Sequence, residues 1–388
     1  MVSFDVSYFL QALPPASTLN YLSRTYGWKP ICSSDQPIYL FLCYRSSAFS
    51  ESFIITASKF PDLCKLDCIS FNHNRFILAG NLEDIMNLRG YFSQLDCQGL
   101  KEEFVKQTTQ KNPKQFLIRD QVWNTDEPRI MGVLNVTPDS FYEGSRYFKH
   151  QDYALIAEKM ILAGADLIDI GGESTRPGSQ SIDEQEEIKR ILPALQQIRH
   201  RFEIPISIDT TKPKVAEVAL EHGADMINDV SGLASGREMI DIVKKHQASY
   251  CLMHCQGTPE SMQVDPKYDD VIAEVVHFFH RSMLTCREGG LELDRIMIDP
   301  GIGFGKRQVD NFDLLKYIGA FNSIGSCLML GTSNKSFIGN YLGRSVEERE
   351  AGTLGTLALG WRMGATFFRV HNVEGARDTL NIAKAYTN

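Results

Sequence analysis

Residues 130–136 read IMGVLNV, a short apolar run with one polar residue near its end, and an amphipathic segment follows at 152–163. The same unit recurs along the rest of the chain. Further apolar runs, most of them ending in Gly, Asn, Asp or Ser, stand at 167–172, 206–209, 226–232, 250–257, 296–301, 327–333 and 367–372. Because the runs are apolar rather than alternating, they are typical of strands buried on both faces of a parallel sheet.

Segments of helical length separate these predicted strands. They lie at 152–163, 183–201, 212–222, 237–246, 269–289, 310–319, 345–364 and 374–386. Helix-start signals support them, such as Asp183 before the second and Pro213 one residue into the third. Eight strand–helix units over about 260 residues predict an α/β fold of the (β/α)8 TIM-barrel type. A doubly wound open sheet is the alternative, but it typically has fewer units and an early glycine-rich dinucleotide turn.

The first part of the chain has a different composition, rich in Phe, Tyr, Ser and Cys. Strand-like pieces stand at 38–44, 52–57 and 75–80, and helix-like pieces at 82–96 and 98–109. We predict a small accessory α/β domain of unknown role over 1–112 and a barrel domain over 113–388, with a polar linker at 107–114. The run QFLIRDQVW at 115–123 is predicted to form a hairpin strand that closes the bottom of the barrel.

The composition restricts the classes of partner. The chain has 388 residues, a formal net charge of −8 and 43% hydrophobic residues, which fits a soluble globular protein without the basic surface of a nucleic-acid binder. Nine cysteines, an odd number, and an N-terminus without a secretory signal predict free thiols and a cytoplasmic location. No run of about 18 apolar residues is present, so no membrane span is expected.

Polar residues stand at the carboxyl ends of the predicted strands, where a TIM barrel forms its active site. They are Asn135, Asp169, Glu173, Asp209, Asn228, Asp229, His254, Asp299, Ser333, Lys335, Arg369 and His371. Turn preferences explain Asp, Asn and Ser at single strand ends, but not polar residues inside apolar runs such as SIDT, INDV and RVHN. The mouth of the barrel is therefore predicted to bind a polar ligand.

The residue types indicate the chemistry of that ligand. Asp209, Asn228 and Asp299 provide the donors and acceptors that read a flat heterocycle with amide and amino groups. Arg369 and His371 alternate along one strand, so both can face the same side of it and bind an anion. The residues alone thus predict a barrel enzyme that binds a heterocycle and a phosphorylated group.

Three candidates at the mouth have further interpretations. Asn135, at the end of the first strand, can join an anion or metal–phosphate site. Arg369 can instead form a structural ion pair with Asp299 or Asp139. Lys335 lies in GTSNKSFIG, a loop that opens a helix and whose backbone amides can hold an anion, although the spacing of a P-loop is absent.

Eight segments carry a more specific signal. They are MGVLNVTPDSF, DIGGESTRPG, SIDTTKPKVAEVAL, INDVSGL, LMHCQGTPESMQ, IDPGIGFGK, GTSNKSFIG and FRVHNV. In these motifs and their order, residues 115–388 resemble the dihydropteroate synthases. The resemblance implies a transferase of folate biosynthesis that condenses 6-hydroxymethyl-7,8-dihydropterin pyrophosphate with p-aminobenzoate, using Mg²⁺ and giving 7,8-dihydropteroate and pyrophosphate. It also implies a homodimer.

The functional residues of that family fall on matching positions here. The resemblance implies that the pterin is bound by Asp209, Asn228, Asp299, Lys335 and Arg369. It implies that the pyrophosphate is bound by Asn135, Arg369 and His371, with Asn135 also at the metal ion. It implies that p-aminobenzoate is bound by Phe141, Thr175, Arg176, Pro177 and Ser336. Lys335, Asp209 and Arg369 are the expected catalytic residues, and His254 is expected to be structural.

Two departures from the family pattern concern the p-aminobenzoate side. After the TPDSF motif, Glu143 and Ser145 stand near the place of the usual Asp and of one of two glycines, and Asn334 replaces the usual Arg before Lys335. Two alternatives therefore stay open. One is a synthase-like paralogue that binds pterin without turnover. The other is a corrinoid-linked methyltetrahydrofolate methyltransferase, for which no cobalamin-binding domain is evident.

Overall fold

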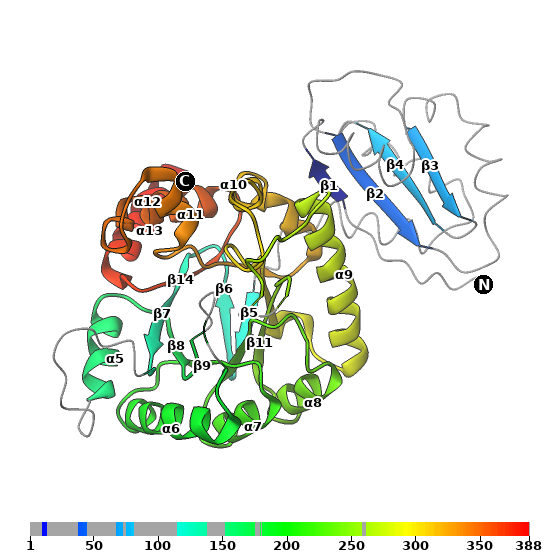
Figure 1. Cartoon of the computed structure of the whole chain (residues 1–388). Helices are drawn as coiled ribbons and strands as arrows, with labels where there is room; N and C mark the ends of the chain where they lie inside the picture. The colour runs from blue at the N-terminus through cyan, green and yellow to red at the C-terminus, as the bar shows by residue number, and fades with distance from the viewer. Residues whose placement is uncertain are drawn as a thin grey trace. The chain divides into compact units, whose positions relative to one another are not determined.

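The computed structural model describes residues 10–13, 38–44, 67–72, 75–80, 115–137, 152–174, 179, 181–257 and 261–387. The chain divides into two compact units, of which one consists mainly of the residues up to Asn112 and the other holds the barrel (Figure 1). The elements predicted at 52–57, 82–96 and 98–109 and the linker at 107–114 lie outside the described residues.

The N-terminal unit contains a four-stranded antiparallel sheet in the order β1-β2-β4-β3. Its strands are β1 Leu10–Leu13, β2 Ile38–Tyr44, β3 Asp67–Asn72 and β4 Arg75–Gly80. The strands predicted at 38–44 and 75–80 are confirmed, whereas β1 and β3 were not predicted.

Eight parallel strands close into a barrel in the order β7 to β14, which confirms the TIM-barrel prediction and rules out the open sheet. They are β7 Arg129–Asn135, β8 Leu167–Gly171, β9 Ile206–Asp209, β10 Met226–Asp229, β11 Ser249–Met253, β12 Ile296–Asp299, β13 Cys327–Leu330 and β14 Phe367–Val370. Several strands end before the predicted runs do, because the Gly, Asn and Ser residues at the ends of those runs form the turns that follow.

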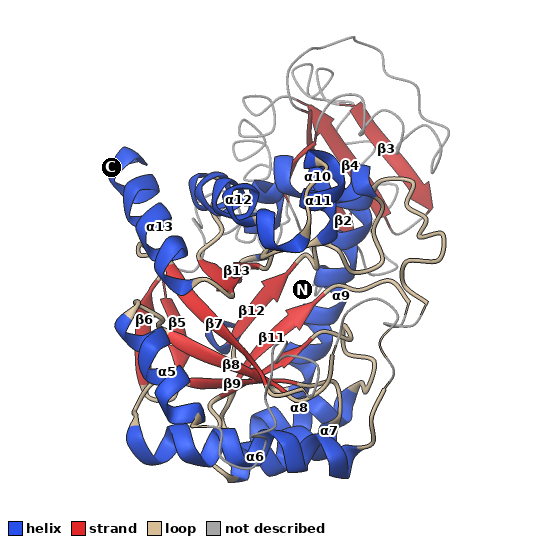
Figure 2. Ribbon diagram, turned by 60° about the vertical axis from the view of Figure 1, so that its left-hand side comes forward, coloured by secondary structure: helices blue, strands red, loops and turns tan. Residues whose placement is uncertain are grey.

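Helices surround the barrel, as Figures 1 and 2 show. They are α5 Tyr153–Leu162, α6 Glu184–Arg201, α7 Pro213–Glu221, α8 Arg237–Lys245, α9 Val271–Gly289, α10 Gln308–Lys316, α11 Ser336–Leu342, α12 Glu350–Arg362 and α13 Val373–Thr387. The predicted start signals act as expected. Asp183 caps α6 by accepting a hydrogen bond from the backbone N–H of Glu186, and Pro213 is the first residue of α7.

A hairpin closes the bottom of the barrel, as predicted from the run at 115–123. Its strands are β5 Gln115–Ile118 and β6 Gln121–Asn124. Phe116, Ile118 and Trp123 join one buried cluster with residues from the amino-terminal halves of the barrel strands, among them Met131 and Phe367. The Phe116 and Phe367 rings meet edge to face, with centroids 5.0 Å apart. The hairpin therefore seals the end opposite the predicted mouth.

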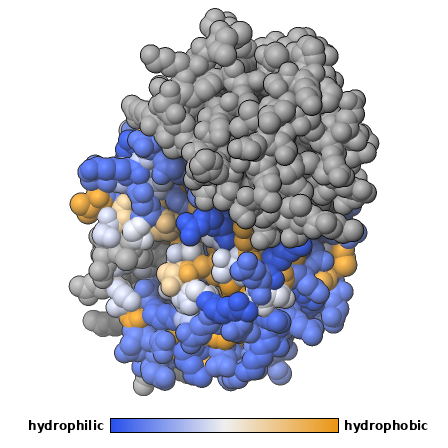
Figure 3. Space-filling view, turned by 90° about the vertical axis from the view of Figure 1, so that its right-hand side faces the viewer, coloured by the Kyte–Doolittle hydropathy of each residue, from blue (hydrophilic) through white to orange (hydrophobic). Residues whose placement is uncertain are grey.

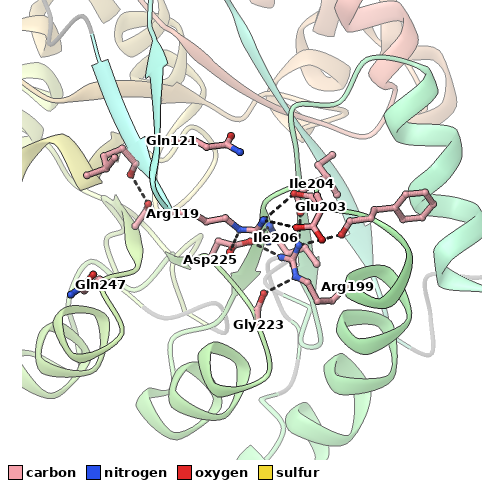
Figure 4. Close-up of polar contacts among 12 residues, drawn as sticks. Arg119, Gln121, Arg199, Glu203, Ile204, Ile206, Gly223, Asp225 and Gln247 are labelled. Atoms are coloured by element: carbon pink, nitrogen blue, oxygen red, sulfur yellow. Dashed lines mark hydrogen bonds and ion pairs between the residues drawn. The ribbon is translucent and has the colours of Figure 1, made fainter.

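A charge network holds this hairpin against the same end of the barrel (Figure 4). Asp225, just before β10, accepts hydrogen bonds from Arg119 Nε at one oxygen and from Arg199 Nη2 at the other, the latter over 2.6 Å. The second oxygen also accepts from the backbone N–H of Ile206 over 2.8 Å. Only 9% of the Asp225 side chain is exposed, so its charge depends on these donors.

Replacing Asp225 by asparagine is expected to lower the free energy of unfolding by roughly 2 kcal/mol, because a charged acceptor shared by two guanidinium groups is lost. The steady-state constants should stay unchanged, since the network lies at the end of the barrel away from the mouth. Urea denaturation and turnover measured on the same preparation test both statements. Glu203→Gln is the control, because the Glu203 side chain is 94% exposed and also pairs with Arg119.

Among the described residues, no helix is long and apolar enough to cross a membrane. On the face that Figure 3 shows, the described residues are mostly hydrophilic, with hydrophobic residues scattered between them.

Candidate active site

The barrel brings most of the predicted site residues to one end. Asn135, Asp209 and Asp299 are the last residues of β7, β9 and β12, and Asn228 and Arg369 stand next to the last positions of β10 and β14. His371 follows β14 directly, Lys335 is the N-cap of α11, and Ser336 is its first residue. Because all eight strands are parallel, their carboxyl ends meet at the same mouth.

Arg369 joins two buried carboxylates at the centre of this mouth. Its Nε donates to Asp169 Oδ2 over 2.7 Å, and its Nη2 donates to Asp209 Oδ2 over 2.8 Å. The side chains of Asp169 and Asp209 are 0% and 5% exposed. Burial lowers the pKa of Arg369, but the two carboxylates outweigh burial and raise it. Burial raises the pKa of Asp209 to about 7, and the Arg369 charge opposes that rise.

The ion pair suggested as an alternative for Arg369 exists, but its partners are Asp169 and Asp209. Asp299 is not among the ion-pair partners of Arg369, and Asp139 lies outside the described residues. The reason is geometric: Asp169 and Asp209 project into the barrel from β8 and β9 at the level that the long Arg369 side chain reaches.

Asp169 is a functional candidate that the sequence interpretation listed at the mouth but to which it gave no binding role. Its Oδ2 accepts from Asn228 Nδ2 over 3.3 Å as well as from Arg369, so it links a predicted pterin residue to a predicted anion residue. A carboxylate in the middle of the apolar run LIDIG was the available signal, because a charge there must be paired.

Three buried oxygen atoms in this cluster have no hydrogen-bond partner within the described part of the chain. They are Asp169 Oδ1, Asp209 Oδ1 and Asn228 Oδ1. An unpaired buried acceptor is costly, and nearly all such atoms in native proteins find a donor. These acceptors therefore fit a ligand that presents several N–H groups.

Lys335 and Asp299 lie on another side of the mouth. Asp299 is 3% exposed, and its Oδ1 accepts from the backbone N–H of Gly301 over 2.8 Å. Lys335 Nζ donates to the carbonyl of Ile302 and lies 4.6 Å from the centroid of the Phe304 ring. Burial lowers the pKa of Lys335 to about 8, and the Asp299 carboxylate opposes that change.

The rim of the mouth carries His371 and Ser333. His371 Nδ1 lies 2.9 Å from Ser333 Oγ, and the backbone N–H of His371 donates to the same oxygen over 3.2 Å. The His371 side chain is exposed and that of Ser333 is half-buried, so an anion from solvent can reach them. Asn135 is half-buried at the end of β7.

The residues predicted for p-aminobenzoate fall mostly outside the described part. Phe141, Thr175, Arg176 and Pro177 are among the residues not described, as is the segment Glu143–Ser145. Ser336 is described and exposed.

Asn334 has a local explanation in the structure. Its φ of +55° lies in the left-handed region, which Asn tolerates better than a longer residue such as Arg does. The backbone of Asn334 is held on both sides: its N–H donates to Thr353 Oγ1 over 3.1 Å, and its carbonyl accepts from Arg349 Nη1 over 3.0 Å. A cation from another part of the chain therefore lies under the loop that carries Lys335.

A cavity of about 370 Å³ opens beside Asp209. Its lining includes Phe304 and Lys212, and Lys212 pairs with Glu173 and, over 2.6 Å, with Glu187. Burial raises the pKa of Glu187, and Lys212 opposes the rise. The cavity extends the mouth towards the segment after β8, and it gives room for a second ring next to the first.

Comparisons with known proteins agree with this geometry. Residues 131–371 match the family model described as pterin binding enzyme. The dihydropteroate synthase of Escherichia coli (strain K12) is 40% identical over 258 residues, which cover 66% of this chain and 91% of that protein. The Synechocystis enzyme of the same name is 40% identical over 257 residues, covering 66% of this chain and 89% of the relative.

Solved structures give the same result. The Yersinia pestis dihydropteroate synthase in a sulfonamide drug complex has a TM-score of 0.67 and 35% identity, and the match covers 70% of this chain and 99% of that one. The Xanthomonas albilineans dihydropteroate synthase with 4-aminobenzoic acid has a TM-score of 0.65 and 36% identity, covering 71% and 98%.

Proposed function

The chain belongs to the dihydropteroate synthases, which are pterin-binding transferases of folate biosynthesis, and we propose that the mouth of its barrel is where the pterin pyrophosphate and p-aminobenzoate react. The observation that carries the proposal is the set of unpaired buried oxygens around Arg369, on Asp169, Asp209 and Asn228. A pterin presents amide, amino and ring N–H donors in one plane. These donors can supply the hydrogen bonds that the three oxygens lack.

We assign the pterin to Asp209, Asn228, Asp299, Lys335 and Arg369. Asp209 and Asn228 supply acceptors in the barrel interior, and Asp299 lies beside Lys335 at the strand end. When the pterin binds, its N–H groups replace the hydrogen bond that Arg369 Nη2 donates to Asp209. The guanidinium stays held by Asp169 and can turn its remaining donors to the pyrophosphate.

The pyrophosphate is assigned to Arg369, His371 and Asn135, which share the β14–β7 side of the mouth. The donor set also fits Mg²⁺. The Asn135 side chain offers an amide oxygen, and Mg²⁺ is usually held by few protein oxygens together with waters and substrate phosphates. Bound there, Mg²⁺ would neutralise charge on the departing pyrophosphate.

The residues of the chain then account for the reaction. As the bond between the pterin methylene and the pyrophosphate oxygen breaks, Arg369 and His371 stabilise the charge that grows on the leaving group. The carboxylates of Asp209 and Asp299 stabilise the cation left on the dihydropterin. The amine nitrogen of p-aminobenzoate forms the new bond and loses a proton. No covalent bond to the enzyme is required.

The aromatic amine is assigned to Phe141, Thr175, Arg176, Pro177 and Ser336. The Xanthomonas albilineans relative was solved with 4-aminobenzoic acid, which supports this substrate. The cavity beside Asp209 provides the volume for a second ring.

The test supplies the protein with pterin pyrophosphate, p-aminobenzoate and Mg²⁺ and measures 7,8-dihydropteroate by mass spectrometry. Product at the mass of the condensed compound, with pyrophosphate released in equal amount, is expected. Bound pterin without product would favour the inactive paralogue instead, and methyl transfer from methyltetrahydrofolate to a corrinoid would favour the methyltransferase.

Three further statements are proposals of the same kind. A homodimer is proposed from the family, and size-exclusion chromatography with light scattering tests it. A cytoplasmic location is proposed from the cysteines, of which Cys251, Cys255, Cys286 and Cys327 are free thiols. An accessory α/β domain over residues 1–112 is proposed beside the barrel domain, with no role assigned.

A further inference from the structure

Lys306 is a buried lysine behind the mouth, and no role assigned above uses it. It is the last residue of the motif GIGFGK, and only 2% of its surface is exposed. Its Nζ donates to the carbonyl of Phe304 over 3.0 Å and to that of His254 over 3.3 Å, and lies 3.0 Å from His254 Nδ1. One amino group therefore ties the loop after β12 to the end of β11.

His254 provides an acceptor for this amino group. The imidazole is 8% exposed, and burial lowers its pKa well below the usual value, with the Lys306 charge acting in the same direction. The ring is therefore neutral, and Nδ1 accepts from Lys306. The ring packs edge to face on Phe278, with centroids 4.9 Å apart, so the acceptor is fixed in place.

The loop of residues 301–305 packs so closely against the residues at the end of β11 that two of its positions have no room for a side chain. A Cβ on Gly301 would come within 1.9 Å of the His254 carbonyl oxygen, and one on Gly305 within 2.2 Å of the Gln256 carbonyl oxygen. Both glycines have positive φ, +69° and +61°. Tyr268 Oη adds a hydrogen bond to the Gly305 carbonyl over 2.8 Å. Glycine allows this approach, and Lys306 provides the bonds that hold it.

The other side of the same loop carries Lys335. The Ile302 carbonyl accepts from Lys335 Nζ, the Phe304 ring lies under that nitrogen, and a Cβ on Gly303 would come within 3.2 Å of Lys335 Cδ. A shift of the loop would therefore move the side chain assigned to the pterin.

We propose that Lys306 is a positioning residue for the synthase reaction: by bonding His254 and Phe304 it fixes the loop of residues 301–305, and that loop fixes Lys335. The inference rests on the proposed function. Because little water reaches its amino group, burial lowers the pKa of Lys306 to about 7. Because Lys306 lies behind the loop, it acts on the substrate only through Lys335 and Phe304.

The principal test compares Lys306→Met with the wild-type chain. Methionine keeps most of the length of the side chain but removes the donor to the His254 carbonyl, which is buried, and to the Phe304 carbonyl, which is half-buried. We expect kcat/KM for pterin pyrophosphate to fall roughly a hundredfold, as misplacement of a binding group by about 1 Å can cost. The KM for p-aminobenzoate should change less, because of the loop residues only Phe304 lines the cavity assigned to the second ring.

The pH profile separates positioning from a merely structural role. The cationic form of Lys335 is lost as pH rises through its pKa of about 8, so wild-type kcat/KM should fall above that pH. The titratable groups around it are Asp299, Arg369, Asp209, Cys255 and Lys306 itself, whose positive charge repels that of Lys335. If the loop is less firmly held in Lys306→Met, water reaches Lys335 and its pKa rises. The alkaline limb of the kcat/KM profile should then move to higher pH. Loss of the Lys306 charge raises the pKa of Lys335 in the same direction, so the limb is also compared in His254→Leu, which keeps that charge; a stability loss alone leaves the limb of His254→Leu at the wild-type pH.

Two variants complete the design. Lys306→Ala should recover part of the lost kcat/KM when methylamine is added, because the small amine can occupy the vacated position. Lys189→Met is the control, since the Lys189 side chain is 79% exposed on α6 and its steady-state constants and pH profile should match the wild type.

If Lys306→Met does not fold, the His254→Leu variant tests the positioning role instead. It removes one of the three acceptors and should shift kcat/KM and the alkaline limb in the same directions by a smaller amount. A variant whose limb stays at the wild-type pH, with activity lost only in proportion to unfolded protein, overturns the inference. A wild-type chain that makes no product would instead overturn the proposed function, so the two failures are distinguishable.

Discussion

Replacing Lys335 by alanine is expected to reduce kcat/KM for dihydropteroate formation by roughly a hundredfold to a thousandfold, the usual effect of removing one preorganised donor from a site. The Lys335 amino group lies above Phe304 beside Asp299, where it is assigned to the pterin. Without it, the ring loses a donor and the buried Asp299 loses its principal opposing charge. Mass-detected product formation, with pterin binding measured separately, tests the expectation.

The control for Lys335→Ala is Lys189→Ala, which removes an exposed lysine of α6 and should leave both constants unchanged. Circular dichroism of each variant shows whether the fold is kept. Turnover at the wild-type rate in folded Lys335→Ala would remove Lys335 from the catalytic residues, and weak pterin binding with normal kcat would confine it to binding.

Replacing Arg369 by methionine is expected to destabilise the fold and to abolish turnover together. The change leaves the carboxylates of Asp169 and Asp209 buried without their cation, and breaking a buried pair in this way costs about 3–5 kcal/mol. The leaving pyrophosphate also loses a bidentate donor. Urea denaturation measures the first effect, and the product assay measures the second.

The stability loss in Arg369→Met should depend on pH in a defined direction. Burial raises the pKa of Asp209 to about 7 from a usual value of 3.8, so between these values the folded state holds a proton that the unfolded state has lost. The free energy of unfolding therefore falls as pH rises through that window. Arg369 lowers this pKa, so its removal extends the window upwards. The difference between variant and wild type should be larger at pH 8 than at pH 5, where the lost pair with Asp169 accounts for it.

Arg201→Met is the control, because the Arg201 side chain is 52% exposed and its ion pair with Asp152 is long, with 3.6 Å between Nη1 and Oδ1. Its unfolding free energy should stay within about 0.5 kcal/mol of the wild type at both pH values. Equal destabilisation of Arg369→Met at pH 5 and pH 8 would contradict the assignment of the shift to Asp209.

The sequence predicted the positions of the strands well, because their signal is local. Each barrel strand is buried on both faces, so each appears as a short apolar run, and the helices between them carry their own start signals at Asp183 and Pro213. The ends of the strands were placed less well. Turn residues extended the predicted runs beyond Asp229, Met253 and Leu330, where the strands stop.

The pairing of charges could not be read from the chain. Arg369 is 200 residues from Asp169 and 160 from Asp209, and their bonds exist only because the closed barrel brings the end of β14 within reach of β8 and β9. The sequence suggested Asp299 as a partner for Arg369. Lys306 is a similar case, since its acceptor His254, which directly follows β11, is 52 residues away in the chain.

The sequence by itself thus determined the barrel, its order of elements and the set of polar residues at its mouth, since periodicity and strand-end positions are properties of neighbouring residues. Only the tertiary structure decided which buried charges neutralise one another and which carboxylate and amide oxygens are left for a ligand. Those depend on distances between side chains from different strands, and a difference of a few ångströms decides whether a buried charge is paired or costs several kcal/mol.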